Sequence, residues 1–251
     1  TIMCDAGNYT ENVDVYKSLR IIGAGAEITS IIPPESDDSI DCTASNVIIR
    51  GFSIVSLSRD YAVNLNGVNH CEVSSNILRG KGSGILIKGS YNNTILGNVM
   101  ISLPGSGVEI RDSSHYNTIF KNLLNQNHYG IIVFNASNYN VISDNFVNSS
   151  DWTGIRLNWL DAGFEPVKFN NVTNNFLHGN NEGIMLDNPS GDNLLQDNMA
   201  SNNNIGIRLR QSNNNTIVSN TMISNSFQGA SVESSYGNLF YDNFFNNPKN
   251  A

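Results

Sequence analysis

The chain has 251 residues, only 14% of them are charged, and its formal net charge is −8. Phosphate backbones and anionic lipid surfaces attract basic proteins, so this charge excludes nucleic acid and anionic membranes as expected partners. No run of about 18 apolar residues occurs, so we expect no membrane-spanning helix in this chain.

The first segment, residues 1–38, consists of short apolar stretches separated by glycine turns. The stretches at 13–15, 19–22 and 28–32 are typical of strands, and Gly23 and Gly25 lie between the last two. We expect residues 1–38 to form the opening coil or coils of the fold and residues 39–251 its regular part, as one continuous domain. The chain starts at a strand and ends on "NNPKNA". We therefore expect a fragment of a longer chain, whose ends meet other domains or neighbouring subunits.

A repeat runs through the remainder of the chain. A glycine followed by an apolar–x–apolar triplet recurs about every 23 residues, at Gly84, Gly107, Gly130, Gly154, Gly183, Gly206 and Gly229. A unit this short, made of strands of three to five residues, cannot bury its own apolar face, but stacked copies can. The repeat predicts an all-β fold: a single-stranded right-handed parallel β-helix of about ten coils, stacked about 4.8 Å apart.

Asparagine marks two further columns on the same period. The first is Asn93, Asn117, Asn140, Asn171, Asn193, Asn215 and Asn238, and the second is Asn98, Asn122, Asn145, Asn175, Asn198, Asn220 and Asn243. Asparagine tolerates the left-handed backbone conformation that bends a chain, and its amide can bond to the same residue in the next coil. We expect these residues to form structural ladders with no catalytic role. Cys71 takes the ladder position one coil before Asn93.

The opening phrase "GNYTENVDVYKSLRIIGAG", residues 7–25, is similar to the first coil of NosD-like parallel β-helix proteins, and much the same phrase opens pectin methylesterases. The asparagine-rich coils at 62–250 resemble the generic parallel β-helix repeat of that superfamily, whose solenoids are of the carbohydrate-binding and sugar-hydrolase type. For function, the NosD resemblance implies a periplasmic accessory protein in the assembly of a copper centre. Copper favours clustered His, Met or Cys ligands. The four histidines lie in scattered coils, so the residues themselves predict no copper site.

Charged residues gather on the outer face of the glycine-marked strands. They include Glu109, Arg111, Arg156, Asp187, Arg208, Arg210 and Glu233. The coil between Gly154 and Gly183 carries an insertion, "WLDAGFEPVKF" at 159–169, and insertions in solenoids often lie on a binding face. We predict a glycan groove formed by Arg156, Asn158, Trp159, Asp187, Arg208 and Arg210. Its aromatic ring would stack on a sugar, and its arginines would pair with uronate carboxylates.

Two other interpretations of this face stay open. Asp187 or Glu109 could act as a general acid or base. The two carboxylates are about 14 Å apart by coil spacing, which is too far for a glycosidase pair. Alternatively, Asp187 with Arg210 and Arg210 with Glu233 form a ladder of ion pairs that needs no ligand. The segment "DNPSGDN" at 187–193 contains oxygen ligands suited to calcium, but a turn between coils explains it as well, so we expect no cofactor.

Cys4 and Cys42 each stand third after a strand start. If those strands stack in consecutive coils, a disulfide between them is feasible; two buried thiols are the alternative. The sequence also offers candidate N-glycosylation sites at Asn8, Asn92, Asn135 and Asn214.

These observations favour a secreted or cell-surface β-helix with a structural or glycan-binding role in an envelope or adhesin protein. The expected partners are polysaccharides or cell-envelope components, and the expected location is extracellular, on the cell surface or periplasmic. One alternative is a polysaccharide lyase or hydrolase acting on a uronate-containing glycan. The other is the copper-centre accessory protein of the NosD resemblance.

Overall fold

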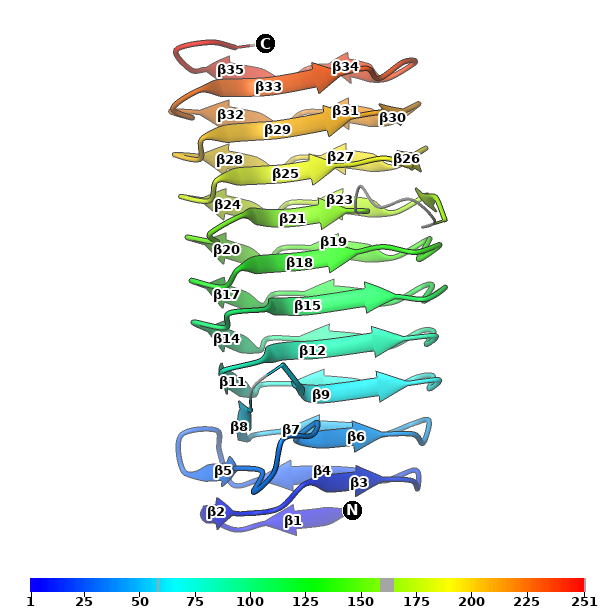
Figure 1. The fold of residues 1–251 in the computed structure, drawn as a ribbon, viewed down its shortest axis with the longest axis vertical. Helices are drawn as coiled ribbons and strands as arrows, with labels where there is room; N and C mark the ends of the chain where they lie inside the picture. The colour runs from blue at the N-terminus through cyan, green and yellow to red at the C-terminus, as the bar shows by residue number, and fades with distance from the viewer. Residues whose placement is uncertain (58, 159–164, 251) are drawn as a thin grey trace.

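The computed structural model describes residues 1–57, 59–158 and 165–250. These residues form no helix, and therefore none that could cross a membrane. They form a rod of stacked coils in which the chain climbs from the N-terminus at one end to the C-terminus at the other (Figure 1). The predicted right-handed parallel β-helix is confirmed.

Each regular coil contributes one strand to each of three parallel sheets. The first sheet consists of β1 (Ile2–Cys4), β4 (Arg20–Gly23), β7 (Ile48–Arg50), β10 (Glu72–Ser74), β13 (Thr94–Leu96), β16 (Thr118–Phe120), β19 (Val141–Ser143), β23 (Asn171–Thr173), β27 (Leu194–Gln196), β31 (Thr216–Val218) and β34 (Leu239–Tyr241). The second sheet consists of β2 (Gly7–Tyr9), β5 (Thr29–Ile31), β8 (Ser53–Ser56), β11 (Ile77–Gly80), β14 (Val99–Ile101), β17 (Leu123–Asn125), β20 (Phe146–Asn148), β24 (Phe176–His178), β28 (Met199–Ser201), β32 (Thr221–Ile223) and β35 (Phe244–Asn246).

The third sheet carries the glycine-marked strands. It consists of β3 (Val13–Val15), β6 (Ile40–Cys42), β9 (Tyr61–Asn66), β12 (Ser83–Lys88), β15 (Ser106–Arg111), β18 (Tyr129–Val133), β21 (Thr153–Leu157), β25 (Glu182–Leu186), β29 (Ile205–Arg210) and β33 (Gln228–Glu233). A small fourth sheet at the following turn consists of β22 (Val167–Lys168), β26 (Ser190–Gly191) and β30 (Ser212–Asn213).

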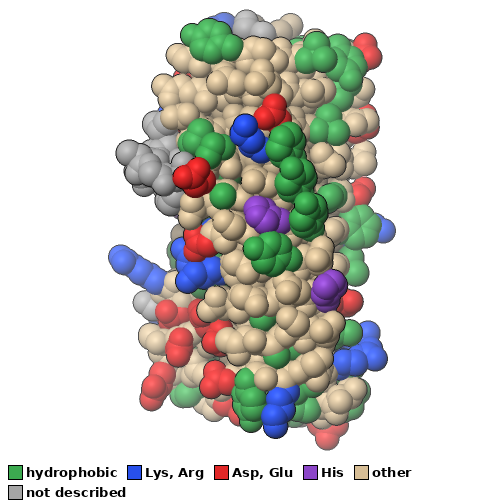
Figure 2. Space-filling view, turned by 90° about the vertical axis from the view of Figure 1, so that its right-hand side faces the viewer, with side chains coloured by type: hydrophobic (Ala, Val, Ile, Leu, Met, Phe, Trp, Pro, Cys, Tyr) green, Lys and Arg blue, Asp and Glu red, His purple; other side chains and the backbone are tan. Residues whose placement is uncertain are grey.

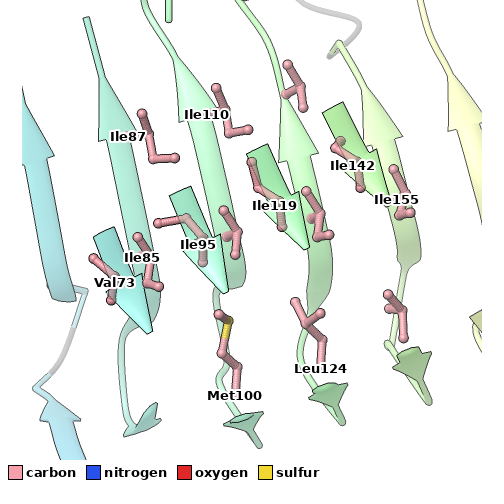
Figure 3. Close-up of a cluster of buried hydrophobic side chains, with 14 of the residues drawn as sticks. Val73, Ile85, Ile87, Ile95, Met100, Ile110, Ile119, Leu124, Ile142 and Ile155 are labelled. Atoms are coloured by element: carbon pink, nitrogen blue, oxygen red, sulfur yellow. The ribbon is translucent and has the colours of Figure 1, made fainter. Parts of the chain in front are cut away.

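The core is built from apolar side chains that lie directly above one another in successive coils (Figure 3). Ile85, Val108 and Ile131 stand in register in the third sheet and are fully buried, as the sequence predicts. In the first sheet the column continues through Leu195 and Phe240, which resolves the choice against their neighbours Leu194 and Leu239. Alternation with period two explains this arrangement, because it turns every second side chain inward.

The glycines of the third sheet are required by close packing inside the coil. A Cβ atom on Gly130 would collide with the carbonyl oxygen of Gly154 and with the side chain of Val147. At Gly84, Gly107 and Gly206 a Cβ atom would likewise collide with the carbonyl oxygen of the equivalent glycine in the next coil. Glycine therefore recurs at this spacing because the backbones of successive coils are in close contact there.

The asparagine ladders are confirmed, with one correction. In the second column, the Asn122 Nδ2 atom donates to Asn145 Oδ1 at 3.0 Å and to the Ile95 carbonyl oxygen at 2.9 Å. In the first column the ladder residue of the long coil is Asn170, not the predicted Asn171, because Asn140 donates to Asn170 Oδ1 while Asn171 is exposed and belongs to β23. With Asn170, the spacing to Asn175 becomes five residues, as in the other coils.

A third ladder escaped the sequence analysis. It lies between the second and third sheets and consists of Asn127, Asn180, Asn203, Asn225 and Asn247. Ser150 takes the ladder position between Asn127 and Asn180, and its hydroxyl oxygen is buried without a hydrogen-bond partner.

The predicted arrangement of Cys4 and Cys42 is wrong. Cys4 pairs with Gly23 in the first sheet, whereas Cys42 pairs with Val15 and Leu65 in the third. The two strands therefore do not stack on each other, and both cysteines are free thiols. The error came from matching two similar strand patterns that belong to different sides of the coil.

Candidate functional site

Three predicted residues meet in a buried charge cluster on the outer face of the third sheet. Arg156 lies in β21, Arg210 ends β29, and Asp187 directly follows β25 in the coil between them. The Asp187 Oδ2 atom lies 2.6 Å from Arg156 Nη2 and 2.7 Å from Arg210 Nη2, and Asp187 Oδ1 accepts from Arg210 Nε at 2.9 Å. Asp187 has no exposed surface.

The arginines keep this buried carboxylate ionised. Burial alone acts to raise the pKa of Asp187, but hydrogen bonds from Arg210, from the Asn188 N–H and from Arg156 outweigh it, so the pKa is lowered. The hydrogen bonds to Asp187 raise the pKa of Arg210 in turn. Asp187 and Arg210 are therefore charged and paired at neutral pH, and Arg156 binds the same carboxylate.

A second cluster lies beside the first. The Arg208 guanidinium binds Glu182 Oε1 at 2.8 Å and Glu233 Oε1 at 2.9 Å. The expected pair of Asp187 with Arg210 is present, but Glu233 pairs with Arg208 instead of Arg210. Three arginines face three carboxylates in the two clusters together, so this region carries no excess positive charge for a uronate.

The first cluster supports the turn that follows Asp187. Asn158 Nδ2 donates to the Pro189 carbonyl oxygen at 2.6 Å, and the Arg156 Nε atom donates to the Asn158 carbonyl oxygen at 3.1 Å. The Asn188 N–H donates to Asp187 Oδ1 at 3.0 Å. The predicted residues Arg156, Asn158 and Asp187 therefore hold the backbone of the 188–190 turn, and we assign them a positioning role.

A surface cavity of about 240 Å³ lies on the other side of this turn. Its lining combines apolar surface, which includes Pro166 and Pro189, with polar residues: Lys168, Asn188, Ser190, Asp192, Gln211 and Asn213. Lys168 Nζ and Asp192 Oδ2 are 3.3 Å apart, so the charged part of the lining is also paired. Hydroxyl, amide and charged groups of both signs at one concave place are suited to a ligand rich in hydroxyl groups.

An aromatic row leads to this cavity along the same turn. Tyr116, Tyr139 and Phe169 occupy one column in three successive coils, and their rings stack at centroid distances of 5.1 Å. Below Tyr116 the row continues through His115 to Tyr91. Hydrophobic side chains gather in a row along this side of the rod (Figure 2). The cavity-lining Asp192 stands one coil above Phe169, because Lys168 pairs with Gly191 in the fourth sheet.

The backbone of the aromatic row is unusual for such residues. Tyr116, Tyr139 and Phe169 have φ angles of 57°, 60° and 57°, the left-handed conformation that bulky side chains disfavour. Each of them directly precedes a ladder asparagine, where other coils have Asn92, Asp192, Asn214 or Gly237. That departure was a signal in the sequence for an exposed aromatic surface, and the sequence analysis did not use it.

The remaining site predictions divide as follows. Trp159 lies outside the described residues. Asn8, Asn92 and Asn214 are exposed, and Asn135 is half-buried with its Nδ2 atom donating to Asp112 Oδ1 at 2.8 Å. Asn214 also lines the cavity. Glu182, which completes the Arg208 cluster, was not predicted. It lies before the glycine of its strand, whereas the predicted face used only positions after that glycine.

Glu109 lies lower on the same face, in β15. Burial raises its pKa, while Arg111 and a hydrogen bond from Tyr61 act to lower it. Arg111 Nε is 3.4 Å from Glu109 Oε1. Among Glu109, Asp187 and Glu233, Glu109 is the carboxylate whose pKa is shifted in the direction a general acid requires.

Comparison with known proteins places the chain in a family. A family model described as periplasmic copper-binding protein (NosD) matches residues 5–160 and 158–251. The chain belongs to the NosD family. No curated protein matches it.

Solved structures similar to this NosD-family chain share its fold at low sequence identity. The Dettilon tailspike protein matches with a TM-score of 0.79 and 16% identity over 94% of this chain and 54% of its own. The A-module of the mannuronan C-5 epimerase AlgE6 of Azotobacter vinelandii matches with 0.70 and 15%, over 99% and 88%. The periplasmic alginate epimerase AlgG matches with 0.53 and 18%, over 87% and 65%. The chain thus spans about half of the tailspike and less than two thirds of AlgG.

The copper named by the family description finds no fitting site in the described part of this chain. Residues 1–57, 59–158 and 165–250 contain no group of three or more His, Cys, Asp or Glu side chains that could hold a metal ion. His115 packs with a tilted ring against Tyr91 and edge-on against Tyr116, and burial lowers its pKa. His128 packs against Tyr129 and Trp152. These histidines serve aromatic packing, so we derive no copper chemistry from them.

Proposed function

We propose that this NosD-family chain is a non-catalytic glycan-binding module of the cell envelope. The observation that carries the proposal is that the aromatic row and the cavity lie along the same edge of the β-helix, where the third sheet turns into the first. A pyranose ring offers apolar C–H faces for aromatic side chains and hydroxyl groups for the amide and charged groups of the cavity. The tailspike and the alginate epimerases, which share this fold, support a polysaccharide partner and an extracellular or periplasmic location.

The paired charges refine the expected ligand. Because Arg156, Arg208 and Arg210 are all engaged with carboxylates, a uronate would have to replace an existing ion pair in order to bind them. Displacing Asp187, which is fully buried, would leave its charge uncompensated at a cost of about 3–5 kcal/mol. The proposal therefore favours a neutral or weakly charged glycan in the cavity.

The test is binding to a panel of neutral and uronate-rich polysaccharides by calorimetry and affinity electrophoresis. Lys168→Ala and Gln211→Ala remove exposed side chains from the cavity, and Tyr139→Asn removes a ring while keeping a residue that accepts a positive φ. We expect each variant to weaken binding about tenfold, equivalent to 1.4 kcal/mol. Lys17→Ala, an exposed lysine in another part of the rod, is the matched control. Wild-type protein that binds no glycan in the panel would exclude this function and leave a structural rod.

Arg208→Ala, alone and with Arg210→Ala, tests the charged face itself. Unchanged binding by folded variants supports the cavity as the contact. A selective loss of binding to uronate-rich glycans would instead assign the ligand to the charged face.

A second candidate function is chemistry on the glycan, and the raised pKa of Glu109 is the observation that favours it. The same panel is assayed for new reducing ends and for the absorbance of new carbon–carbon double bonds. Turnover that disappears in Glu109→Gln would establish an enzyme. No turnover by wild-type protein supports the binding module.

A further inference from the structure

The amide ladders end towards the low-numbered coils, and Cys71 stands where the first ladder stops. Its backbone N–H donates to Asn93 Oδ1 at 2.8 Å, as that of a ladder asparagine does. A ladder asparagine also donates its amide to a carbonyl oxygen one coil below, as Asn117 does to Ser90 at 3.0 Å. Cys71 places its Sγ atom at the equivalent point, 3.4 Å from the carbonyl oxygen of Ala44.

A second thiol meets the same carbonyl. Cys42, the last residue of β6, places its Sγ atom 3.3 Å from the Ala44 oxygen. The two sulfur atoms therefore contact the same backbone oxygen and lie close to each other in the core. Both side chains are buried, with 0% and 2% of the residue exposed. Cys4 is in the first sheet and is not part of this pair.

The contact makes the two thiols chemically unequal. The neighbouring Cys42 thiol lowers the pKa of Cys71 to about 7, although burial acts in the opposite direction. The same contact, together with burial, raises the pKa of Cys42. An attacking thiolate with a pKa near ambient pH is the most effective in thiol–disulfide exchange, so Cys71 is the expected nucleophile of the pair.

We propose that Cys42 and Cys71 form an intrachain disulfide when the chain folds in an oxidising compartment, with a small-molecule or protein disulfide as the oxidant. The Cys71 thiolate attacks one sulfur of the oxidant and releases the other as a thiolate. Cys42 then loses its proton, attacks the Cys71 sulfur and releases the second thiolate. Two protein thiols thus lose two protons and two electrons, and the oxidant disulfide is reduced to two thiols.

The burial of the two cysteine side chains restricts when this reaction can occur. An oxidant cannot approach two side chains with almost no exposed surface, so the bond forms while the coils assemble or when they open. The bond links β6 to the turn before β10, at the low-numbered end of the first amide ladder. It restrains the unfolded chain by closing a loop of about 30 residues, a size at which stabilisation by a disulfide is substantial.

The experiment uses the whole chain, unfolded and reduced, then refolded over a range of reduced-to-oxidised glutathione ratios. Thiols are trapped with an alkylating reagent in denaturant, followed by intact mass measurement and peptide mapping. We expect one alkylated thiol, on Cys4, and a crosslinked peptide pair containing Cys42 and Cys71. Three alkylated thiols at every ratio, a stable glutathione adduct on Cys42 or Cys71 of the wild-type chain, or a crosslink through Cys4 would each overturn the proposal.

Matched variants distinguish the effect of the disulfide on the melting temperature from general effects of oxidation. In wild-type protein and in Cys4→Ser, the oxidised form should melt about 5 °C or more above the reduced form. In Cys71→Ser this difference should vanish. If Cys71→Ser does not fold, the peptide map of the wild-type chain still decides the question. If the wild-type disulfide forms but the melting temperature does not change, the bond is confirmed and its stabilising role is overturned.

Discussion

At the scale of single residues, the charges of this protein are used for structure more than for recognition. Asp187 is completely buried and is held by Arg156 and Arg210, and together they support the 188–190 turn beside the cavity. A buried ion pair contributes little over an apolar replacement, but removing one partner leaves a buried charge unpaired. The effect of mutation is therefore expected to be large even where the net contribution of the cluster is small.

Asp187→Asn should destabilise the fold by about 3–5 kcal/mol at pH 7. The folded-state pKa of Asp187 is lowered, so its stabilisation is present above the unfolded-state value of about 3.9 and is lost as pH falls through the lower, folded-state pKa. Urea unfolding from pH 7 to pH 2 measures this. The gap between wild type and Asp187→Asn should narrow below about pH 4. A gap that stays constant down to pH 2 would show that the charge is not responsible.

At the scale of the element, columns of side chains at equivalent positions in successive coils stabilise the solenoid. A column is complete where every coil supplies the required residue. The second ladder is continuous from Asn76 to Asn243. The third is interrupted at Ser150, whose side chain is too short to bridge Asn127 and Asn180. A ladder asparagine forms hydrogen bonds to buried backbone groups in two coils. At Ser150 these hydrogen bonds are not all formed.

Ser150→Asn should therefore stabilise the protein. The new amide can accept from the Asn127 N–H and donate to Asn180 Oδ1, and each net hydrogen bond contributes about 0.5–1.5 kcal/mol. For a chain of this size we expect the melting temperature to rise by about 2–6 °C. Ser36→Asn makes the same chemical change at an exposed position outside the ladders and should leave the melting temperature nearly unchanged. Equal shifts in both variants would contradict the ladder explanation.

At the scale of the whole molecule, the two ends of the solenoid differ in how their coils are joined. The three ladders begin at Asn76, Asn93 and Asn127, whereas they continue to Asn238, Asn243 and Asn247 near the other end. The low-numbered coils therefore lack continuous amide columns and rely on sheet hydrogen bonds, apolar packing and isolated side-chain bonds, such as that from Asn12 Nδ2 to the Asp38 carbonyl oxygen. Solenoids open locally, and stability in them is a sum over coils and their interfaces.

Hydrogen exchange followed by mass spectrometry should reveal this difference in the reduced protein. We expect backbone amides of β4–β6 to exchange about tenfold faster than those of β31–β33, because fewer side-chain bonds close the low-numbered coils. Equal protection in both regions would mean that the ladders add little to coil stability. A Cys42–Cys71 disulfide should slow exchange in β6 and leave β31–β33 unaffected.

The fold was predictable because every coil repeats the same physical requirement. The glycine column, the apolar columns and two of the three ladders follow from the period alone. The Asn170 position failed because two adjacent asparagines in "FNNVTNN" fit the pattern equally well, and only the ladder hydrogen bonds distinguish them. The site was less predictable. The charged face was located correctly, but the mutual pairing of its charges depends on side-chain directions that spacing does not give.

The long coil shows how little the core constrains the turn after the third sheet. Asn140 and Asn145 are each separated from their ladder partners Asn170 and Asn175 by 30 residues, against 22 to 24 in the other coils, yet the amide bonds across this step are 3.1 and 3.0 Å, as elsewhere. The extra residues therefore leave the register of all three sheets unchanged. Peptides of other lengths and sequences can be exchanged at this turn without redesigning the core, which makes the molecule a practical display framework whose recognition surface can be diversified independently of its folding.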